Sequence, residues 1–277
     1  FALIARHHNR LGFSAPKVLA EDSGNGFLLL EYLGDDTFSR LLAKGESEEE
    51  LYALAVDVLA ALHTLPAAAA APGWLDAYDE GKLLEEASWF TDWYLPAVSG
   101  KETAAATRDA YLAAWRTVLP IVHAQPRALV LRDYHVDNLL RLKGRDGVRA
   151  CGLLDFQDAV AGPAAYDMVS LLEDARRDIG GDLAQAMLGR YFDVMENVNR
   201  ESFLATYAVL GAQRHAKIIG VFSRLSRRDG KDAYLCHIPR VWGLLERSLK
   251  NPLLSPLKTW FDANVPEELR RRPEKLG

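Results

Sequence analysis

Hydrophobic and polar positions follow a helical period over most of the chain. After Ser47, apolar residues recur every three or four positions, at 51, 54, 55, 58 and 62, which predicts a core helix. Ser47 and Glu50 form a capping box in which the Ser47 side chain accepts from the backbone N–H of Glu50, so the helix should begin there. Similar patterns predict helices over residues 1–11, 82–95, 102–122, 164–176, 182–197, 201–224 and 236–250.

Strand patterns are confined to two places. Lys17–Glu21 and Phe27–Tyr32 are expected to pair as a hairpin, because a cluster of turn-forming residues separates them. Strand signals return at residues 128–132, 139–142 and 148–154. The alanine-rich run Ala67–Ala71, which precedes Pro72-Gly73, is expected to be a loop. Helices that are separate from a few antiparallel strands predict an α+β fold rather than an α/β fold.

The later strand region predicts a second hairpin. Asp146-Gly147 is a preferred pair for a two-residue turn, and a turn centred there places Asn138 opposite Asp155 at the open end of the hairpin. A longer turn through Gly144 would shift this pairing by about one residue and would still bring the two side chains together. The sequence therefore predicts an amide oxygen beside a carboxylate.

Oxygen ligands of this kind suit Mg²⁺, which takes few protein ligands and keeps phosphate oxygens and waters as the rest. Asp133 lies five residues before Asn138, where its carboxylate could accept the proton of a substrate hydroxyl. Phosphoryl transfer needs such positioning and charge screening more than covalent chemistry. Taken alone, Asp133 and Asn138 could equally cap loops at strand ends. The strand-loop-hairpin context, which brings in Asp155, favours phosphoryl transfer.

These motifs resemble those of a known superfamily. Arg132-Asp133, Asn138 and Asp155-Phe156 are similar to the catalytic loop and metal-binding motif of protein-kinase-like proteins, closest to the aminoglycoside phosphotransferase and choline kinase branch. That branch commonly continues into a Gly-Pro step and then Tyr-Asp at the start of a helix, as in Gly162-Pro163 and Tyr166-Asp167. Further segments resemble the bacterial cell-wall-recycling kinases that phosphorylate the anomeric hydroxyl of N-acetylmuramate and N-acetylglucosamine. These segments are residues 26–31, 131–138, 171–178 and 237–242.

The resemblance implies a role for each residue of the motif. Asp133 would be the catalytic base, and Asn138 and Asp155 would bind Mg²⁺. Arg132 and Asp167 would support the catalytic loop, Asp167 by accepting hydrogen bonds from the loop backbone. ATP and Mg²⁺ are the co-substrate and cofactor that this family implies.

Other candidate residues contact the nucleotide or the acceptor. Glu31, Tyr32 and Leu33 would form a hinge whose backbone contacts adenine between apolar walls. The aromatic stretch of residues 89–94 is expected mainly in the core, although aromatic rings could also stack on a sugar. The candidate acceptor-binding residues, each with a plainer alternative as a cap, loop, surface or core residue, are Asp158, His135, Arg176 and Trp93.

The resemblance also implies a two-lobed fold. Residues 1–33 would be part of an N-terminal nucleotide-binding lobe, and residues 34–277 a helical C-terminal lobe that carries the catalytic hairpin and binds substrate. The chain starts without Met and already in a helix, so we expect a truncated N-terminal lobe whose phosphate-covering loop and Lys come earlier. Two positions depart from the family pattern, because Leu131 replaces a His and Gln157 replaces a Gly. Neither change removes a reacting group.

Composition excludes several classes of function. A formal net charge of -5 gives none of the basic character of a nucleic-acid-binding protein, and no apolar run approaches the ~20 residues of a membrane span. We expect a monomer in the cytoplasm that binds a nucleotide and a small sugar. Cys151 and Cys236 could form one disulfide, but we expect two buried free thiols. The pair His7-His8 is expected on the surface.

Two other functions stay open from the sequence. Another small-molecule kinase, such as an aminoglycoside phosphotransferase, would need a clustered acidic rim for its polycationic substrate, and residues 46–50 and 85–86 are the only candidates. A non-catalytic pseudokinase or binding module is the second alternative, because no phosphate-covering loop is visible. Phosphorylation of an amino sugar at its anomeric hydroxyl is the function that we expect.

Overall fold

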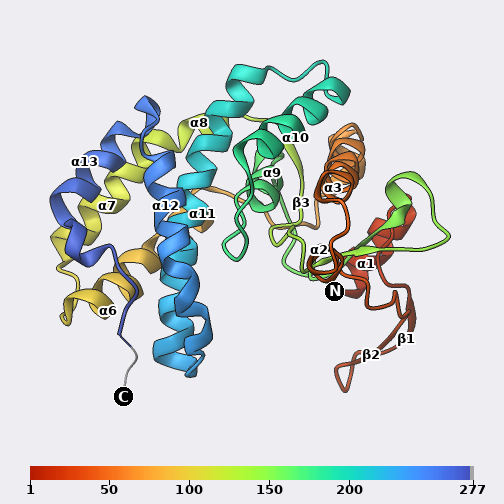
Figure 1. Ribbon diagram of the computed structural model, residues 1–277, viewed down its shortest axis with the longest axis horizontal. Helices are drawn as coiled ribbons and strands as arrows, with labels where there is room; N and C mark the ends of the chain where they lie inside the picture. Colours follow the sequence, from red (N-terminus) through yellow and green to blue (C-terminus); the bar gives the residue numbers. More distant parts are fainter. Residues whose placement is uncertain (275–277) are drawn as a thin grey trace. The chain divides into compact units, whose positions relative to one another are not determined.

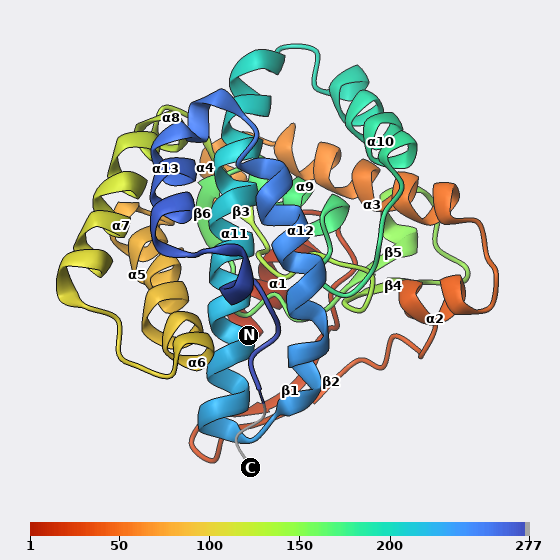
Figure 2. The same cartoon turned by 60° about the vertical axis from the view of Figure 1, so that its left-hand side comes forward.

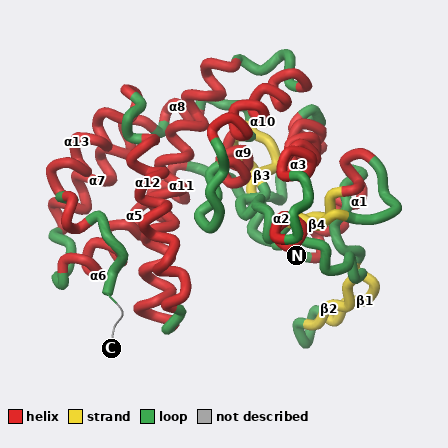
Figure 3. Tube along the Cα trace, viewed as in Figure 1, coloured by secondary structure: helices red, strands yellow, loops and turns green. Residues whose placement is uncertain are grey.

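The computed structural model describes residues 1–274, which form two compact units. Unit 1 comprises Phe1–Ala77, Pro126–Leu172 and Ile179–Val198, and unit 2 comprises Tyr78–Gln125, Glu173–Asp178 and the segment from Asn199 onward. Helices far outnumber strands, and the strands lie in separate two-stranded sheets, which confirms the α+β class (Figure 3). The predicted division into a nucleotide-binding lobe (residues 1–33) and a catalytic lobe (residues 34–277) is a division by function, and it stays a prediction.

Unit 1 contains six of the helices. They are α1 (Ala2–Arg10), α2 (Phe38–Ala43), α3 (Glu48–His63), α4 (Ala67–Ala70), α9 (Ala165–Leu172) and α10 (Gly181–Val194) (Figure 1). Helix α3 begins as predicted, with the Ser47 side chain accepting from the N–H of Glu50 at 3.2 Å. The loop prediction for Ala67–Ala71 is wrong. Alanine has the highest helix propensity, and the N–H groups of Ala69 and Ala70 close a helical turn on the carbonyl of Pro66.

The strands of unit 1 pair in three antiparallel sheets. β1 (Val18–Asp22) pairs with β2 (Phe27–Leu30), β3 (Arg127–Val130) with β6 (Val160–Pro163), and β4 (Leu139–Arg141) with β5 (Cys151–Leu153). The first hairpin is therefore confirmed. β6 was not predicted, because its short Gly-Pro segment has little strand propensity of its own and is held by pairing with β3.

Helix α1 is covered on more than one side, which contradicts the surface prediction for His7 and His8. His8 has 0% of its surface exposed, and its ring packs edge-on against Phe156 with centroids 5.0 Å apart. His7 is also buried, and its Nε2 lies 3.0 Å from the carbonyl oxygen of Ala70. Burial, with a smaller effect of His7, lowers the pKa of His8 to about 3. The prediction failed because we expected at least one of these two neighbouring helix residues to point into solvent.

Unit 2 is almost entirely helical. Its helices are α5 (Glu80–Trp89), the π-helical turn η1 (Phe90–Tyr94), α6 (Leu95–Ser99), α7 (Ala105–Val118), α8 (Pro120–His123), α11 (Arg200–Asp229), α12 (Ile238–Ser248) and α13 (Ser255–Asn264). The long helix α11 packs along α12 and α5 (Figure 2). Helix α13 and the short helix α2 of unit 1 were not predicted. The short 3₁₀ turns of the chain are η2 (Gly147–Ala150), η3 (Asp232–His237), η4 (Pro252–Leu254) and η5 (Glu267–Leu269).

The aromatic stretch on α5 and η1 belongs largely to the core of unit 2. Phe90 and Tyr94 are fully buried, which confirms the core interpretation for these two residues. Gly220 of α11 lies directly against the π-helical turn, since a Cβ at this position would lie 2.4 Å from the carbonyl carbon of Trp89. The guanidinium of Arg224 lies over the Trp89 ring at 4.7 Å.

Both cysteines of the chain are free, but they differ in exposure. Cys151 is buried, whereas Cys236 is exposed, so the prediction of burial is wrong for Cys236. Cys236 lies in the short 3₁₀ turn η3 before α12, where a solvent-facing position carries no packing requirement. Within residues 1–274, no helix has the length and apolar character needed to cross a bilayer.

Candidate active site

The hairpin of β4 and β5 has a longer connection than predicted. The strands pair Leu139 with Leu153 and Arg141 with Cys151, which is one residue away from the predicted register. Gly144 and Gly147 both adopt positive φ, at +77° and +55°, and η2 follows, so Asp146-Gly147 is not an isolated two-residue turn. The two-residue turn at Asp146-Gly147 is wrong, and the alternative of a longer turn through Gly144, which shifts the register by about one residue, is confirmed.

Asn138 and Asp155 nevertheless meet at the open end of the hairpin. The Nδ2 of Asn138 lies 3.3 Å from Oδ2 of Asp155, and the same nitrogen donates to the backbone carbonyl of Asp133 at 2.9 Å. It also faces Nε2 of His135 at 3.4 Å. Among the described residues, no hydrogen-bond donor reaches Oδ1 of Asn138. Asn138 therefore joins Asp133, His135 and Asp155, so four of the predicted site residues lie together and an amide oxygen is left available.

The loop that carries Asp133 is fixed by its neighbours on α9. The fully buried carboxylate of Asp167 accepts from the backbone N–H of Leu131 at 2.6 Å and of Arg132 at 2.9 Å. The hydroxyl of Ser170 donates to the carbonyl of Arg132 at 3.0 Å. Ser170 was missed in the sequence, although its spacing of three from Asp167 places both residues on one face of the helix.

On the other side of Asp133, Tyr134 anchors the loop to helix α3. Its hydroxyl is buried and donates to the carbonyl of Ala55 at 2.8 Å. Burial raises the pKa of this hydroxyl well above its ordinary value, so it remains a donor. Asp133 itself is half-buried between these two anchored segments. The backbone around the predicted base is thus held before any substrate binds.

Two residues of this site have a strained backbone. Arg132 has φ of +70° and Asp155 has φ of +56°, and within residues 1–274 they are the two non-glycine residues with positive φ. This conformation costs of order 1–3 kcal/mol and persists where surrounding contacts impose it. For Arg132 those contacts come from Asp167 and Ser170. Strain of this kind concentrates at functional sites, and here it flanks both Asp133 and Asn138.

Asp155 is held by the residues that follow it. The ring of Phe156 is buried between His8 and Phe1, with the Phe1 ring stacked at 4.9 Å. The side-chain amide of Gln157 donates to Oδ1 of Asp155 at 2.6 Å. In the sequence, Gln157 is only a departure from the family pattern, and no sequence signal predicts its contact with Asp155. Asp155 itself is exposed, so its carboxylate is accessible.

The other predicted site residues of unit 1 differ in their surroundings. The carboxylate of Glu31 pairs with Arg145 at 2.9 Å, which gives this side chain a structural contact. Tyr32 is 75% exposed, and no described residue makes a hydrogen bond with the backbone N–H of Leu33. His135 is buried beside Asn138, whereas Asp158 is exposed. The adenine-contacting and acceptor-binding roles remain predictions.

Arg176 and Trp93 belong to unit 2 and are not part of this cluster of unit 1. The backbone N–H of Arg176 donates to Asp174 at 2.8 Å, and Trp93 is half-buried on η1. Their predicted roles in binding the acceptor also remain predictions.

The donor set fits a hard cation with few protein ligands. Within residues 1–274 there is no group of three His, Cys, Asp or Glu residues that could hold a metal ion. Asn138 and the exposed Asp155 offer an amide oxygen and carboxylate oxygens, although the amide nitrogen of Asn138 is the atom turned toward Asp155 in this structure. Such a pair suits Mg²⁺, which keeps phosphate oxygens and waters in its remaining positions.

Two curated relatives match nearly the whole chain. The N-acetylmuramate/N-acetylglucosamine kinase of Caulobacter vibrioides is 40% identical over 276 residues, which cover 98% of this chain and 76% of the relative. The protein of the same name from Pseudomonas aeruginosa is 37% identical over 257 residues, which cover 89% of this chain and 72% of the relative.

Solved structures show the fold of the chain, and a family model shows its family. A choline/ethanolamine kinase family protein from Mesorhizobium loti matches with a TM-score of 0.63 at 15% identity, covering 94% of this chain and 81% of that protein. The ADP-bound aminoglycoside phosphotransferase APH(2'')-Ib matches with a TM-score of 0.56 at 17% identity, covering 88% of this chain and 79% of that protein. These likenesses confirm the predicted protein-kinase-like fold. The model of the phosphotransferase enzyme family matches residues 1–203, and this chain belongs to that family.

Proposed function

We propose that this chain transfers the γ-phosphoryl group of ATP to the anomeric hydroxyl of an amino sugar, N-acetylmuramate or N-acetylglucosamine. The acceptor follows from the names of the relatives that match almost the full chain. The observation that carries the phosphotransfer site is the pair of strained residues, Arg132 and Asp155, on either side of Asp133 and Asn138. Two such residues in one loop-and-hairpin cluster favour a local geometry that the surrounding contacts impose.

In the proposed mechanism, the acceptor hydroxyl is the nucleophile. Asp133 accepts its proton as the bond forms between the acceptor oxygen and the γ-phosphorus. The bond between this phosphorus and the β–γ bridging oxygen breaks, and ADP leaves with that electron pair. The products are ADP, a sugar 1-phosphate and the proton on Asp133, which solvent then takes.

The remaining residues position these groups. Asn138 and Asp155 would hold Mg²⁺, which supplies charge screening on the phosphate oxygens when bound. Asp167 and Ser170 keep the catalytic loop in place through Leu131 and Arg132. A loop that is already ordered costs no reorganisation at the moment of reaction.

The setting that fits this chemistry is a monomeric enzyme in the cytoplasm. Both cysteines of the chain are free thiols, as a reducing compartment favours. The proposed partners are the nucleotide and the sugar, without nucleic acid or membrane.

A screen of ADP release with ATP and Mg²⁺ tests the proposal. We expect turnover with N-acetylmuramate and N-acetylglucosamine, and none with choline or kanamycin. The methyl glycoside of N-acetylglucosamine is the matched control, because it lacks only the anomeric hydroxyl. Turnover with choline or kanamycin alone would contradict the amino-sugar assignment, and equal turnover with the methyl glycoside would contradict the anomeric acceptor.

A further inference from the structure

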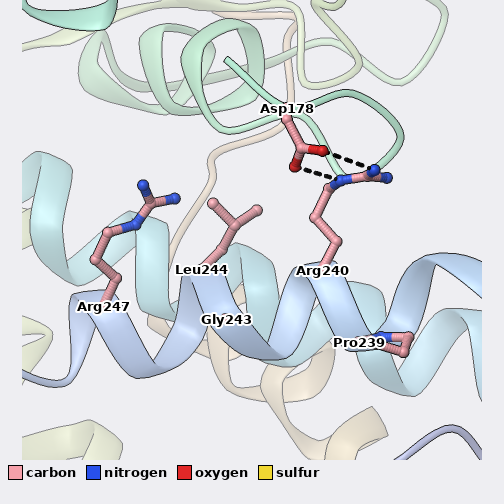
Figure 4. A pocket seen from close by; sticks show the side chains of 6 residues that line it. All are labelled: Asp178, Pro239, Arg240, Gly243, Leu244 and Arg247. Atoms are coloured by element: carbon pink, nitrogen blue, oxygen red, sulfur yellow. Dashed lines mark hydrogen bonds and ion pairs between the residues drawn. The ribbon is translucent and has the colours of Figure 1, made fainter. Parts of the chain in front are cut away.

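Helix α12 of unit 2 presents two arginines beside a hollow. Arg240, Gly243, Leu244 and Arg247 are spaced by three, four and seven positions, so they share one face of the helix. Together with Pro239 and Asp178 they line a hollow of about 410 Å³. Figure 4 shows the three long side chains of this face extending from α12 toward the side on which Asp178 lies.

Gly243 keeps the hollow open between the two arginines. A Cβ added at this position would meet no atom within 4 Å, so the space above the glycine is unfilled. The neighbouring Leu244 is buried to 7% exposure and supplies an apolar floor. The hollow therefore combines a positive rim with a small apolar surface.

One of the two arginines already holds a carboxylate. Arg240 donates from Nε to Oδ1 of Asp178 at 2.6 Å and from Nη2 to Oδ2 at 3.0 Å, which is a bidentate pair (Figure 4). This pair connects two segments noted in the sequence, residues 171–178 and 237–242, that lie 62 positions apart in the chain. It shows the fork geometry that an arginine on this face can offer to a carboxylate.

The second arginine has no such partner. Within the described part of the chain, no hydrogen bond or ion pair reaches the guanidinium of Arg247. The carboxylates whose charges it influences, Asp178 and Glu173, are already paired, Asp178 with Arg240 and Glu173 with Nε2 of the buried His215 at 3.1 Å. Glu246, the adjacent acid on α12, pairs with Arg270. The planar fork of Arg247 is thus left with its donors available at the edge of the hollow.

We propose that this hollow binds a small organic carboxylate, with Arg247 holding the carboxylate and the Gly243–Leu244 surface contacting its apolar part. A carboxylate carries one negative charge and is planar, so it suits the two-donor fork that Arg247 offers. A dianionic phosphate fits less well, since Asp178 and Glu173 would repel its second charge. The proposal goes beyond the phosphotransfer site and rests on α12 and its neighbours alone.

The carboxylate could come from two sources, and both supply the same chemistry. It is either the carboxylate of an acceptor such as N-acetylmuramate or that of a separate small acid such as lactate. N-acetylglucosamine lacks a carboxylate and is therefore the neutral counterpart of N-acetylmuramate.

Calorimetric titration of the full chain with D-lactate, N-acetylmuramate and inorganic phosphate tests the proposal. We expect Arg247→Gln to weaken the binding of at least one carboxylate by tenfold or more, and phosphate to bind more weakly than that carboxylate. Gly243→Leu should weaken the same ligand, because it fills the hollow while replacing glycine with a better helix former. Arg227→Gln is the matched control, since Arg227 is an exposed arginine of α11 outside the hollow, and it should leave binding unchanged.

Two further measurements identify the source of the carboxylate: KM for each sugar, and lactate binding at saturating N-acetylmuramate. If it belongs to the acceptor, Arg247→Gln raises KM for N-acetylmuramate and leaves KM for N-acetylglucosamine unchanged. If it is a separate acid, lactate still binds the wild type at saturating N-acetylmuramate. The proposal is overturned if neither carboxylate binds the wild type, or if Arg247→Gln and Gly243→Leu bind both as the wild type does. The binding readings stand even if the protein phosphorylates no sugar, so the two proposals fail separately.

Discussion

The loop that carries Asp133 in unit 1 and the hollow on α12 in unit 2 are both proposed to present charged side chains to a ligand, but they hold these side chains differently. Around Asp133, a buried carboxylate and two hydroxyls fix the backbone itself, at the cost of strain at Arg132 and Asp155. On α12, regular helical spacing and one ion pair are enough to hold the charged side chains on one face. The donors of Arg247 remain available. A group that reacts must be placed before the substrate arrives, whereas a group that only binds can leave its final geometry to the ligand.

The largest effect is expected at Asp167, which holds the backbone of the loop that carries Asp133. Asp167→Ala leaves the N–H groups of Leu131 and Arg132 without their buried acceptor, so the free energy of unfolding should fall by about 3–5 kcal/mol, and activity should fall with it. Urea unfolding measures the first effect. Asp158→Ala, an exposed neighbour of the same site, should change the free energy of unfolding by less than about 0.5 kcal/mol. Equal stability of the two variants would refute the role given to Asp167.

A pH-dependent loss of stability should come next, from His8 beneath Phe156. Burial lowers the pKa of His8 to about 3 in the folded protein, whereas the unfolded value is near 6.5. Because protonation then favours the unfolded chain, the contribution of neutral His8 is complete above pH about 6.5 and is lost as the pH falls toward 3.

Between pH 7 and pH 5, the wild type should lose about 2 kcal/mol more unfolding free energy than His8→Phe. Neither ring nitrogen of His8 has a hydrogen-bond partner, so phenylalanine sacrifices no contact of that kind. The measurement is urea unfolding of both proteins at the two pH values. Parallel pH profiles would show that His8 is not the group responsible.

A smaller effect is expected at Gln157, which acts on the site through Asp155. Gln157→Ala removes the hydrogen bond to Oδ1 of Asp155, and loss of such a supporting contact typically weakens a metal site by tenfold or more. We expect the half-saturating Mg²⁺ concentration to rise about tenfold, with the free energy of unfolding nearly unchanged. An unaltered Mg²⁺ dependence would mean that the hydrogen bond does not orient the carboxylate.

The smallest effect is expected from the ion pair on α12. Asp178 is 82% exposed at its side chain, so Asp178→Asn should change the free energy of unfolding by less than about 1 kcal/mol. Thermal or urea unfolding checks this directly. A loss above about 2 kcal/mol would show that the pair is structural, and the contrast between the two regions would then disappear.

The cluster that we propose as catalytic was predictable because its parts lie close in sequence. Asp133 and Asn138 share one loop, and a hairpin returns the chain to Asp155, so even a register error of one residue left Asn138 beside Asp155. The support from Asp167 came from the family resemblance, since no local pattern connects it to a loop 35 residues earlier. Ser170 could have been added by helical spacing, whereas the contact of Gln157 depends on a side-chain conformation.

Other features depended on tertiary contacts that local patterns do not encode. Strand β6 exists through its pairing with β3, and His8 is buried because chain far from α1 in sequence covers it. The α12 hollow required the meeting of Asp178 and Arg240 across 62 positions. Leu244 and Gly243 alone would have suggested only an ordinary amphipathic helix.

The turnover of Asp133→Asn with ATP, Mg²⁺ and N-acetylmuramate tests the central claim most directly. Substitution of a proton-accepting carboxylate by an amide of the same shape should lower kcat by about 10²–10⁴-fold, while nucleotide affinity is retained. Asp146→Asn, in the exposed connection of the same hairpin, should keep the wild-type rate. If Asp133→Asn turned over as fast as the wild type, the assignment of Asp133 as the catalytic base would be wrong.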